Sequence, residues 1–354
     1  MKQEIIDKIN RLANQDEPFL FVINYQGDKA FIRQLSDINP EECLFDFEGR
    51  GNSSDEMKNN SEKIAEISWQ IAPPLYEDYE RSFDIVKNNI MAGNSYLTNL
   101  TCKVPVSCNL SLEDIFHRAK GKYKLLLRRK RNLTPFVCFS PETFVRIKNG
   151  RIYSYPMKGT LDASLPDAEK QLMEDWKEAA EHATIVDLIR NDLSRVAENV
   201  RVDKYRYIDV LHTNKGDILQ TSSEISGRLP EDYQEHLGEI LDAQLPAGSI
   251  TGAPKDKTMQ IIHEAEGYDR GFYTGIMGIY DQGELNSAVM IRFIEEETSP
   301  VDFEADGKKN FKASEGMGDE ASRELYFKAG GGITSKSDCR KEYEEVIQKI
   351  YLPF

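Results

Sequence analysis

The 354-residue sequence lacks the features that would tie it to a membrane or to the outside of the cell. No apolar run approaches the roughly 18 residues of a membrane-spanning helix, and the first residues contain no apolar signal-peptide core. Cysteine is scarce, and the five cysteines form no CxxC pair. Scattered cysteines in an odd number predict free thiols in a reducing compartment. We therefore expect a cytoplasmic protein that does not bind membranes.

Positive charge is also in short supply. The chain has 45 Lys and Arg against 60 Asp and Glu, which gives a net charge of -15. Nucleic-acid binding requires a basic surface, so nucleic acid is not expected as a partner. A small anionic substrate remains compatible with this charge, because a local basic pocket or a bound metal ion can reverse the field. No linker rich in Pro, Gly and Ser divides the chain, so we expect one domain over residues 1–354.

The patterns of apolar, turn-forming and helix-capping residues predict several elements. An acidic, Gly-containing stretch at 295–322 is interpreted as an extended excursion between two strands, an insertion without an assigned role. The predicted elements are a hairpin at 19–23 and 30–32, a polar loop at 49–60, a helix at 79–92, a strand at 96–106, strands at 136–147 and 152–156, one long helix at 167–196, a strand at 321–328 leading into a glycine-rich turn, and a helix at 338–351.

Two pairs of glutamates occur at helical spacing. Glu178 and Glu181 are three residues apart in the predicted long helix, and Glu342 and Glu345 are three apart in the C-terminal one. Residues at i and i+3 share one face of a helix, so each pair presents two carboxylates together. Taken alone, such faces are most often solvated surface. If the two helices meet, the four carboxylates suit a hard cation such as Mg²⁺, which usually takes one or two of them directly and keeps several waters.

Six motifs occur in one order along the chain. Lys158, in YPMKGT at 155–160, lies sixteen residues after Glu142 in SPETF at 140–144. The motifs EHATIVDLIRNDL at 181–193, GSITGAPK at 248–255, AGGGI at 329–333 and EYEE at 342–345 follow. Together they resemble the chorismate-utilising enzymes, a family that includes component I of anthranilate synthase and of aminodeoxychorismate synthase, and the isochorismate and salicylate synthases. The resemblance covers about residues 79–350, and the part before it, about 1–78, is weaker and shorter than in typical members.

The resemblance implies an α+β fold with two antiparallel β-sheets packed orthogonally, helices on their outer faces and the site between the sheets. It implies Mg²⁺ as cofactor, with Glu178, Glu181, Glu342 and Glu345 as its ligands, and chorismate as substrate. Arg292 matches the arginine that binds the enolpyruvyl carboxylate, for which a planar guanidinium is well suited. The other positions that match substrate contacts are Gly159, Ser249, Tyr273, Gly330, Gly331, Gly332 and Lys349.

Lys158 separates members of this family. The anthranilate synthases carry a small residue there, whereas aminodeoxychorismate synthases carry lysine. In the latter, this lysine is proposed to attack C2 of chorismate and expel the C4 hydroxyl, after which ammonia attacks C4. Glu142 matches the proposed general acid/base, which needs a raised pKa to hold its proton near neutral pH. In isochorismate-type relatives, a lysine here serves instead as the base for an attacking water.

The resemblance therefore implies a component I that makes 4-amino-4-deoxychorismate, on the way to p-aminobenzoate and folate. No Cys-His-Glu amidotransferase pattern is visible, so we expect ammonia from a separate glutamine amidotransferase subunit. Three alternatives remain: an isochorismate or salicylate synthase, an anthranilate synthase component I, and an idle scaffold subunit for a glutaminase.

Three departures from the family pattern bear on function. The usual histidine of a His-Leu-Val-Ser run is Gln220 here, so a proton-transfer role at that position is lost. Phe293 replaces the threonine after Arg292, and residues 132–136 match the tryptophan-associated motif only loosely, so we expect no control by tryptophan. We assign Asp187, Arg190, Asn191 and Asp192 a structural role, as buried pairs and caps at a helix end.

Overall fold

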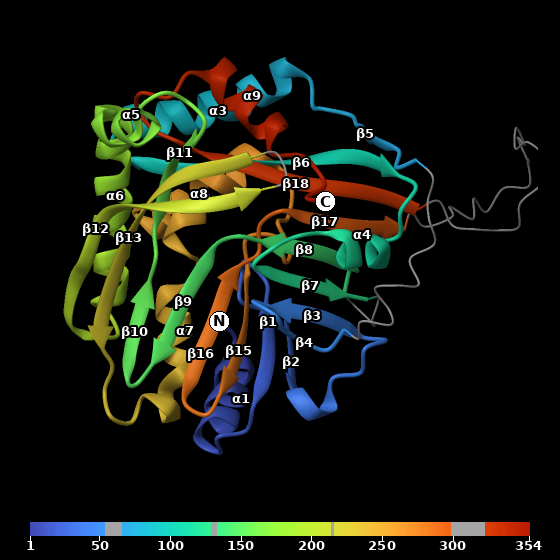
Figure 1. The fold of residues 1–354 in the computed structure, drawn as a ribbon, viewed down its shortest axis with the longest axis vertical. Helices are drawn as coiled ribbons and strands as arrows, with labels where there is room; N and C mark the ends of the chain where they lie inside the picture. Colours follow the sequence, from blue (N-terminus) through green and yellow to red (C-terminus); the bar gives the residue numbers. More distant parts are fainter. Residues whose placement is uncertain (54–65, 129–132, 214–215, 299–322) are drawn as a thin grey trace, which may run out of the picture.

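Two antiparallel β-sheets whose strands cross at a steep angle make up the centre of the protein (Figure 1). The computed structural model describes residues 1–53, 66–128, 133–213, 216–298 and 323–354. Within them the first sheet has the order β11-β13-β10-β9-β16-β15-β1-β2 with β12 paired to β13, and the second has the order β14-β6-β18-β17-β8-β7-β3-β4 with β5 paired to β6. The expected fold class is confirmed.

The strands of the first sheet are β1 (Phe19–Ile23), β2 (Ala30–Gln34), β9 (Thr143–Lys148), β10 (Arg151–Ser154), β11 (Met157–Asp162), β12 (Glu198–Thr213), β13 (Gly216–Arg228), β15 (Ile276–Asp281) and β16 (Glu284–Val289). Those of the second are β3 (Cys43–Phe47), β4 (Arg50–Gly51), β5 (Trp69–Ile71), β6 (Leu97–Cys108), β7 (Tyr123–Leu127), β8 (Phe136–Ser140), β14 (Gly252–Ala253), β17 (Phe293–Thr298) and β18 (Arg323–Ile333).

Helices cover the outer faces of both sheets (Figure 1). On the first sheet lie α1 (Gln3–Asn14) and α7 (Leu237–Gln244), and α5 (Ala168–Glu174) and α6 (Trp176–Leu193) lie against β11 and β13. On the second lie α3 (Tyr76–Met91), α4 (Leu112–Arg118), α8 (Lys255–Glu266) and α9 (Cys339–Gln348). Short 3-10 turns are η1 (Leu35–Asp37), η2 (Tyr233–His236) and η3 (Gly248–Ile250). No helix of the described segments is long and apolar enough to cross a membrane.

Strand β1 shows how the two sheets are held together. Successive side chains of a strand point to opposite faces. Phe19, Phe21 and Ile23 therefore pack under α1 in one hydrophobic cluster, while Leu20 and Val22 pack between the sheets in another. All five are fully buried, so the alternation produces two cores, one outside the first sheet and one between the sheets.

The predicted strand over 136–147 is wrong, because the chain leaves one sheet for the other in its middle. Strand β8 pairs with β7 and β17 in the second sheet, whereas β9 pairs with β10 and β16 in the first. Pro141 lies at the passage, and proline cannot donate to a strand ladder. The passage places Glu142 between the sheets.

The predicted single helix over 167–196 is also wrong, since it consists of two helices that meet at Asp175. Asp175 has an extended backbone, and its carboxylate accepts hydrogen bonds from the backbone N–H groups of Lys177 (2.9 Å) and Glu178 (3.0 Å). This is an N-cap, which satisfies donors that the helix itself leaves unpaired. It starts α6 at Trp176 and sets Glu178 in its first turn.

The glycine-rich turn expected after residue 328 is instead part of a strand. Gly330, Gly331 and Gly332 lie within β18 and pair with β6 opposite Thr101, Leu100 and Asn99. Strand β17 pairs only with the first half of β18, up to Lys328. The glycines therefore lie in a stretch of β18 beyond the end of β17.

Several predicted elements and the predicted free thiols are confirmed. The hairpin at 19–32, the helix at 79–92, the strand at 96–106 and the C-terminal helix are confirmed as β1–β2, α3, β6 and α9. All five cysteines are free thiols. The loop predicted at 49–60 begins with the short strand β4, and its residues from 54 on, like 299–322 of the acidic stretch, lie outside the described residues.

A buried ion pair joins the second sheet to the loops near its edge. Arg270 and Glu266 have side chains that are 2% and 1% exposed and make two hydrogen bonds to each other, of 2.6 and 2.8 Å. The Arg270 guanidinium also donates to the carbonyl oxygens of Ile250 in η3 and Asn99 in β6. One guanidinium thus fixes α8, β6 and η3 relative to one another.

We predict that Glu266→Ala lowers the free energy of unfolding by about 3–5 kcal/mol, because it leaves the Arg270 charge buried and uncompensated. Urea titration followed by circular dichroism measures this. Glu264→Ala, an exposed change on the same helix, is the control and should stay within about 0.5 kcal/mol of wild type. Equal effects of the two changes would contradict the structural role of the pair.

Candidate active site

Lys158 extends from the first sheet toward the second. It lies in β11 at an irregularity in the pairing with β13, between Lys158 and Thr160, where Gly159 has a φ of +70°. A bulge of this kind re-aims the adjacent side chain, and the positive φ favours glycine. The Lys158 Nζ lies 3.8 Å from Glu181 Oε2 on α6. A Cβ atom at Gly332 in β18 would come 3.8 Å from the same Nζ, so Lys158 reaches the glycine strand.

Two passages of the chain between the sheets run side by side at the site. One is Pro141–Glu142, between β8 and β9, and the other is residues 290–292, between β16 and β17. The Val289 N–H donates to the Glu142 carbonyl (3.2 Å), and the Phe139 N–H donates to the Arg292 carbonyl (3.1 Å). These bonds fix the backbones of Glu142 and Arg292 relative to each other.

The Glu142 carboxyl lies among predicted site residues. The Ser249 hydroxyl in η3 donates to its Oε1 at 2.5 Å. Burial raises the pKa of Glu142 above its usual range, although the Ser249 hydrogen bond and the charges of Lys158, Arg292 and Lys349 oppose the rise. A carboxyl that retains its proton at higher pH has the property needed of a general acid.

Arg292 has an unsatisfied donor and a strained backbone. Its φ is +55°, and its Nε is buried with no hydrogen-bond partner among the described residues. Unpaired buried donors are rare, and backbone strain concentrates at functional sites. Tyr273, 3% exposed, lies near it: burial raises the pKa of Tyr273, and the Arg270 and Arg292 charges oppose the rise. The free donor is suited to an anionic ligand.

The glutamate pairs lie beside the glycines. A Cβ at Gly159 would come 3.0 Å from Glu178 Oε2, and one at Gly331 would come 3.6 Å from Glu342 Oε2. Burial and then the neighbouring Glu181 raise the pKa of Glu178. Burial also raises the pKa of Glu342, a hydrogen bond from Ser337 opposes this, and the Glu345 charge adds to the rise. Each pair therefore concentrates negative charge next to a position without a side chain.

Glu345 differs from Glu181 in that its lysine partner lies within hydrogen-bond distance. Lys349 Nζ lies 2.7 Å from Glu345 Oε1 and also donates to the Gly330 carbonyl at 3.0 Å. Burial alone would raise the pKa of Glu345, but the charge and hydrogen bond of Lys349, helped by Lys158 and Lys177, lower it overall. Lys349 thus links α9 to the glycine strand.

The four glutamates suit a hard divalent cation by their chemistry. The donors are all oxygens, their mutual repulsion favours a cation, and Gly159 and Gly331 leave space beside two of them. Within the described residues, no group of three or more His, Cys, Asp and Glu side chains is arranged as a ready set of metal ligands. Mg²⁺ is compatible with this spacing, because it keeps several waters and takes few carboxylates directly.

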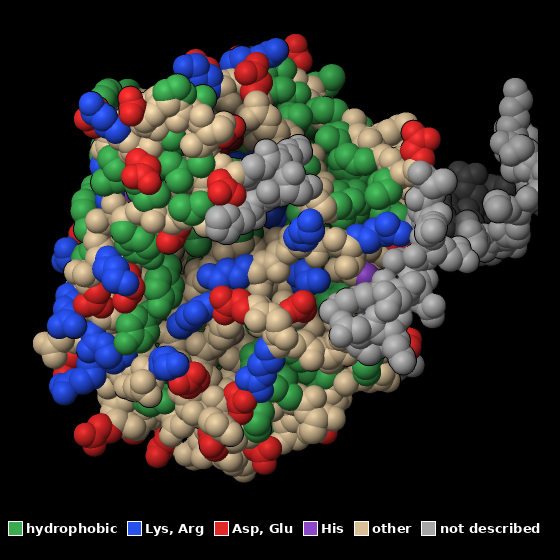
Figure 2. Space-filling model, in the orientation of Figure 1, with side chains coloured by type: hydrophobic (Ala, Val, Ile, Leu, Met, Phe, Trp, Pro, Cys, Tyr) green, Lys and Arg blue, Asp and Glu red, His purple; other side chains and the backbone are tan. Residues whose placement is uncertain are grey.

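One face of the molecule carries many basic side chains. Figure 2 shows Lys and Arg side chains gathered across the middle of one face of the molecule, interspersed with Asp and Glu. The chain as a whole carries a charge of -15. Such a local concentration can attract an anionic substrate despite the overall charge.

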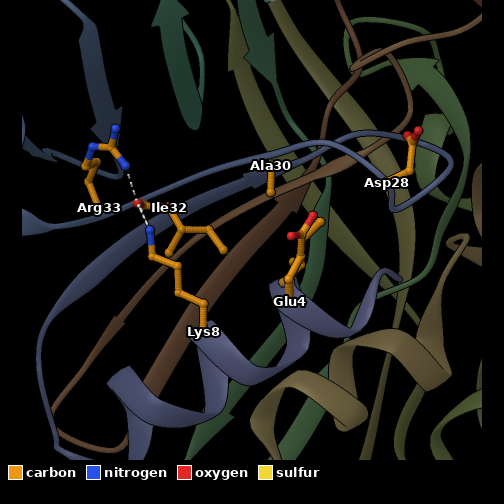
Figure 3. Close-up of a pocket in the computed structure, with 7 residues that line it drawn as sticks. Glu4, Lys8, Asp28, Ala30, Ile32 and Arg33 are labelled. Atoms are coloured by element: carbon orange, nitrogen blue, oxygen red, sulfur yellow. Dashed lines mark hydrogen bonds between the residues drawn. The ribbon is translucent and has the colours of Figure 1, made fainter.

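A hollow lies away from these residues, between α1 and the edge strand β2 (Figure 3). Its lining includes none of the predicted site residues. Lys8 and Arg33 each donate to the Ile32 carbonyl there at 2.9 Å. Charged side chains on an edge strand prevent pairing with another chain, and we interpret this hollow as edge protection.

Sequence reasoning missed two residues at the site. His182 on α6 is fully buried, and its Nε2 lies 2.6 Å from Ser223 Oγ. Burial, then the charges of Arg206 and Lys158, lower the pKa of His182 to about 4, so this histidine is neutral. Lys177 lies 3.8 Å from Glu181 Oε1. Lys177 precedes Glu178 and His182 follows Glu181 in the sequence, and these positions could have indicated that both residues lie at the site.

The structural role assigned to residues 187–192 holds for Asp192. It forms a buried ion pair of 2.9 Å with Lys255. The prediction of a buried pair is wrong for Asp187 and Arg190. Both lie on the solvent side of α6, with side chains 66% and 48% exposed, and 3.7 Å separates their charged atoms. Gln220 lies in β13 opposite Thr160 and Asp209.

The sequence profile of the chorismate-binding enzymes matches residues 13–307. An uncharacterized PabA-like protein of Haemophilus influenzae is 46% identical over 99% of this chain and 97% of its own length. Component 1 of aminodeoxychorismate synthase from Salmonella typhimurium is 30% identical, over 77% of this chain and 56% of its own length.

Solved structures show the same fold. Anthranilate synthase component I of Streptococcus pneumoniae superimposes with a TM-score of 0.61 and 25% identity, over 80% of this chain and 58% of its own. The menaquinone-specific isochorismate synthase MenF of Escherichia coli has a TM-score of 0.67 and 15% identity, over 98% of this chain and 80% of its own. These likenesses do not distinguish the reactions.

We predict that Glu142→Gln makes the protein more stable than wild type at alkaline pH and equally stable below about pH 4. Glu142 has a higher pKa in the folded than in the unfolded chain. The wild-type protein therefore loses stability as pH rises from the ordinary glutamate pKa, about 4.3, through the raised one. Urea unfolding between pH 4 and 9 measures the difference. The exposed change Glu169→Gln on α5 should follow wild type, and a Glu142→Gln curve parallel to wild type would refute the assignment.

Proposed function

The chain belongs to the chorismate-binding enzyme family, and we propose that it is component I of an aminodeoxychorismate synthase. In this proposal it converts chorismate and ammonia to 4-amino-4-deoxychorismate and water, on the way to p-aminobenzoate and folate. The observation that carries the proposal is the position of Lys158. Its amine reaches from β11 to Gly332 of the opposite sheet, and its charge acts on the Glu142 carboxyl.

Lys158 and Glu142 divide the first half of the reaction between them. After the Lys158 ammonium has lost a proton to solvent, its amine gives its electron pair to C2 of chorismate, the ring double bonds shift, and the C4–O bond breaks. Glu142 gives its proton to the departing oxygen, which leaves as water. The raised pKa of Glu142 supports this role, since the proton must be present near neutral pH.

The second half restores both residues. Ammonia gives its electron pair to C4, the double bonds shift back, and the C2–N bond breaks to release Lys158 as an amine. One proton of the new C4 ammonium returns to the Glu142 carboxylate. Atoms and charges balance as chorismate plus ammonia giving the 4-amino product plus water.

The remaining site residues bind and orient the substrate in this proposal. The unpaired Nε of Arg292 supports a contact to the enolpyruvyl carboxylate. Glu178, Glu181, Glu342 and Glu345 would hold Mg²⁺, which supplies positive charge for the ring carboxylate and for the oxygen that leaves. Ser249 orients Glu142, and Lys349 links α9 to Gly330. Tyr273 and the glycines of β18 complete the contacts.

The proposed partner is a glutamine amidotransferase subunit that delivers ammonia. The name of the Salmonella relative, a component 1, supports a second component. If this is correct, ammonium salts alone sustain turnover of the isolated chain, and glutamine does so only after the second subunit is added.

We predict that the isolated chain with chorismate, Mg²⁺ and ammonium forms a 4-amino product, and that Lys158→Ala lowers its rate at least about 100-fold. Products are separated by liquid chromatography. Lys170→Ala is the matched control, because Lys170 is an exposed lysine of α5 that pairs with Glu174 of the same helix at 4.0 Å.

Each alternative gives a different result in the same assay. Isochorismate or salicylate formed without ammonia would move the chain to the water-using branch. A 2-amino product that persists in Lys158→Ala would indicate an anthranilate synthase. If no product forms with any nitrogen donor, the remaining interpretation is a scaffold subunit for a glutaminase.

A further inference from the structure

Lys177 lies at the junction of the two glutamate pairs. It is the second residue of α6, next to Glu178, and its Nζ lies 3.8 Å from Glu181 Oε1. Its positive charge also opposes the rise in the pKa of Glu178 and of Glu342, and contributes to the lowered pKa of Glu345. Lys177 therefore contacts Glu181 directly, and it acts on the other three carboxylates through its charge alone.

The other two lysines at these carboxylates have additional contacts. Lys349 donates to the Gly330 carbonyl, and Lys158 reaches Gly332 in the proposed attacking position. Within the described residues, the Lys177 ammonium has the Glu181 carboxylate as its only ion-pair partner and makes no hydrogen bond. It is half-exposed, with 51% of its side chain accessible, so it can move away without breaking any other bond.

Lys177 also lies where α6 and α9 approach each other. The two helices pack on different sheets, α6 against β11 and β13 and α9 against β18. Beside Lys177, the Lys336 ammonium, just before α9, lies 4.5 Å from the centre of the Trp176 ring on α6. The Lys336 contact thus links the segment just before α9 to the first residue of α6.

We propose that Lys177 is an internal counter-ion that competes with the divalent cation for the four glutamates and so weakens cation binding. The inference rests on the metal role in the proposed function. An ammonium carries half the charge of Mg²⁺ and has three donors that can contact several carboxylates in turn. It keeps the two acidic helices together without the cation, and the cation must displace it to bind.

The competition has a definite direction and a modest size. Removing one positive charge close to a divalent cation favours binding, and partial exposure screens the effect. We expect Lys177→Gln to bind Mg²⁺ about three- to tenfold more tightly than wild type. The gain should shrink as the salt concentration rises, because ions screen exposed charges.

The test is isothermal titration calorimetry of Mg²⁺ into the full chain without chorismate, repeated at low and high salt. Lys177→Arg keeps the charge and should bind as wild type does. Lys170→Gln removes one positive charge elsewhere and should stay within about twofold of wild type. Circular dichroism checks that each variant is folded.

The outcomes separate this inference from the proposed function. If wild type binds Mg²⁺ and Lys177→Gln binds it equally or more weakly, the counter-ion role is overturned and the proposed reaction is untouched. Tighter binding in Lys170→Gln as well would show a general charge effect and also overturn it. A wild-type chain that binds no Mg²⁺ at millimolar concentration refutes the metal site and with it the counter-ion. If the chromatographic assay yields isochorismate, the reaction proposal fails while the Lys177 result still holds.

Discussion

A strand cannot pass from one sheet to another without interrupting its ladder of backbone hydrogen bonds, and this constraint determines where the site forms. Glu142 and Arg292 lie at two such passages, and backbone hydrogen bonds join the passages to each other. Ser249 comes from η3, on the connection from the first sheet to β14 of the second. The chemical groups thus lie where the backbone has left its regular pairing, between two rigid sheets that hold them in place.

Charge compensation is the second condition, because the site concentrates five carboxylates in an acidic protein. Buried carboxylates are costly unless cations or hydrogen bonds offset their charge. Burial raises the pKa of Glu142, and the charges of Lys158, Lys349 and Arg292 limit this rise. Lys158 and Lys177 contact Glu181. These cationic side chains therefore offset the charge of the acidic groups within one network.

The N-terminal segment is built into this arrangement, and the family match covers it from residue 13 on. Strand β1 pairs along its whole length with β15, whose partner β16 leads directly into the passage that carries Arg292. Both faces of β1 are buried, under α1 and between the sheets. The N-terminal segment therefore supports the site through this strand.

Local sequence patterns identified the functional side chains, whereas pairing between strands far apart in the sequence decided how those side chains are arranged. The helix α1 has Ile5, Ile9 and Leu12 at helical spacing, a pattern that predicts a helix, although the predicted elements do not include one there. The break at Asp175 was visible as an N-capping residue, yet the apolar pattern continues across it. Pro141 marked a break beside Glu142, but the change of sheet could not be found in this way: β8 and β9 are both buried strands, and their assignment to different sheets depends on pairing that includes β17 and β16, more than a hundred residues away. Pairs at i and i+3 are fixed by one helix, whereas the meeting of Lys158 with Gly332 depends on how two whole sheets cross.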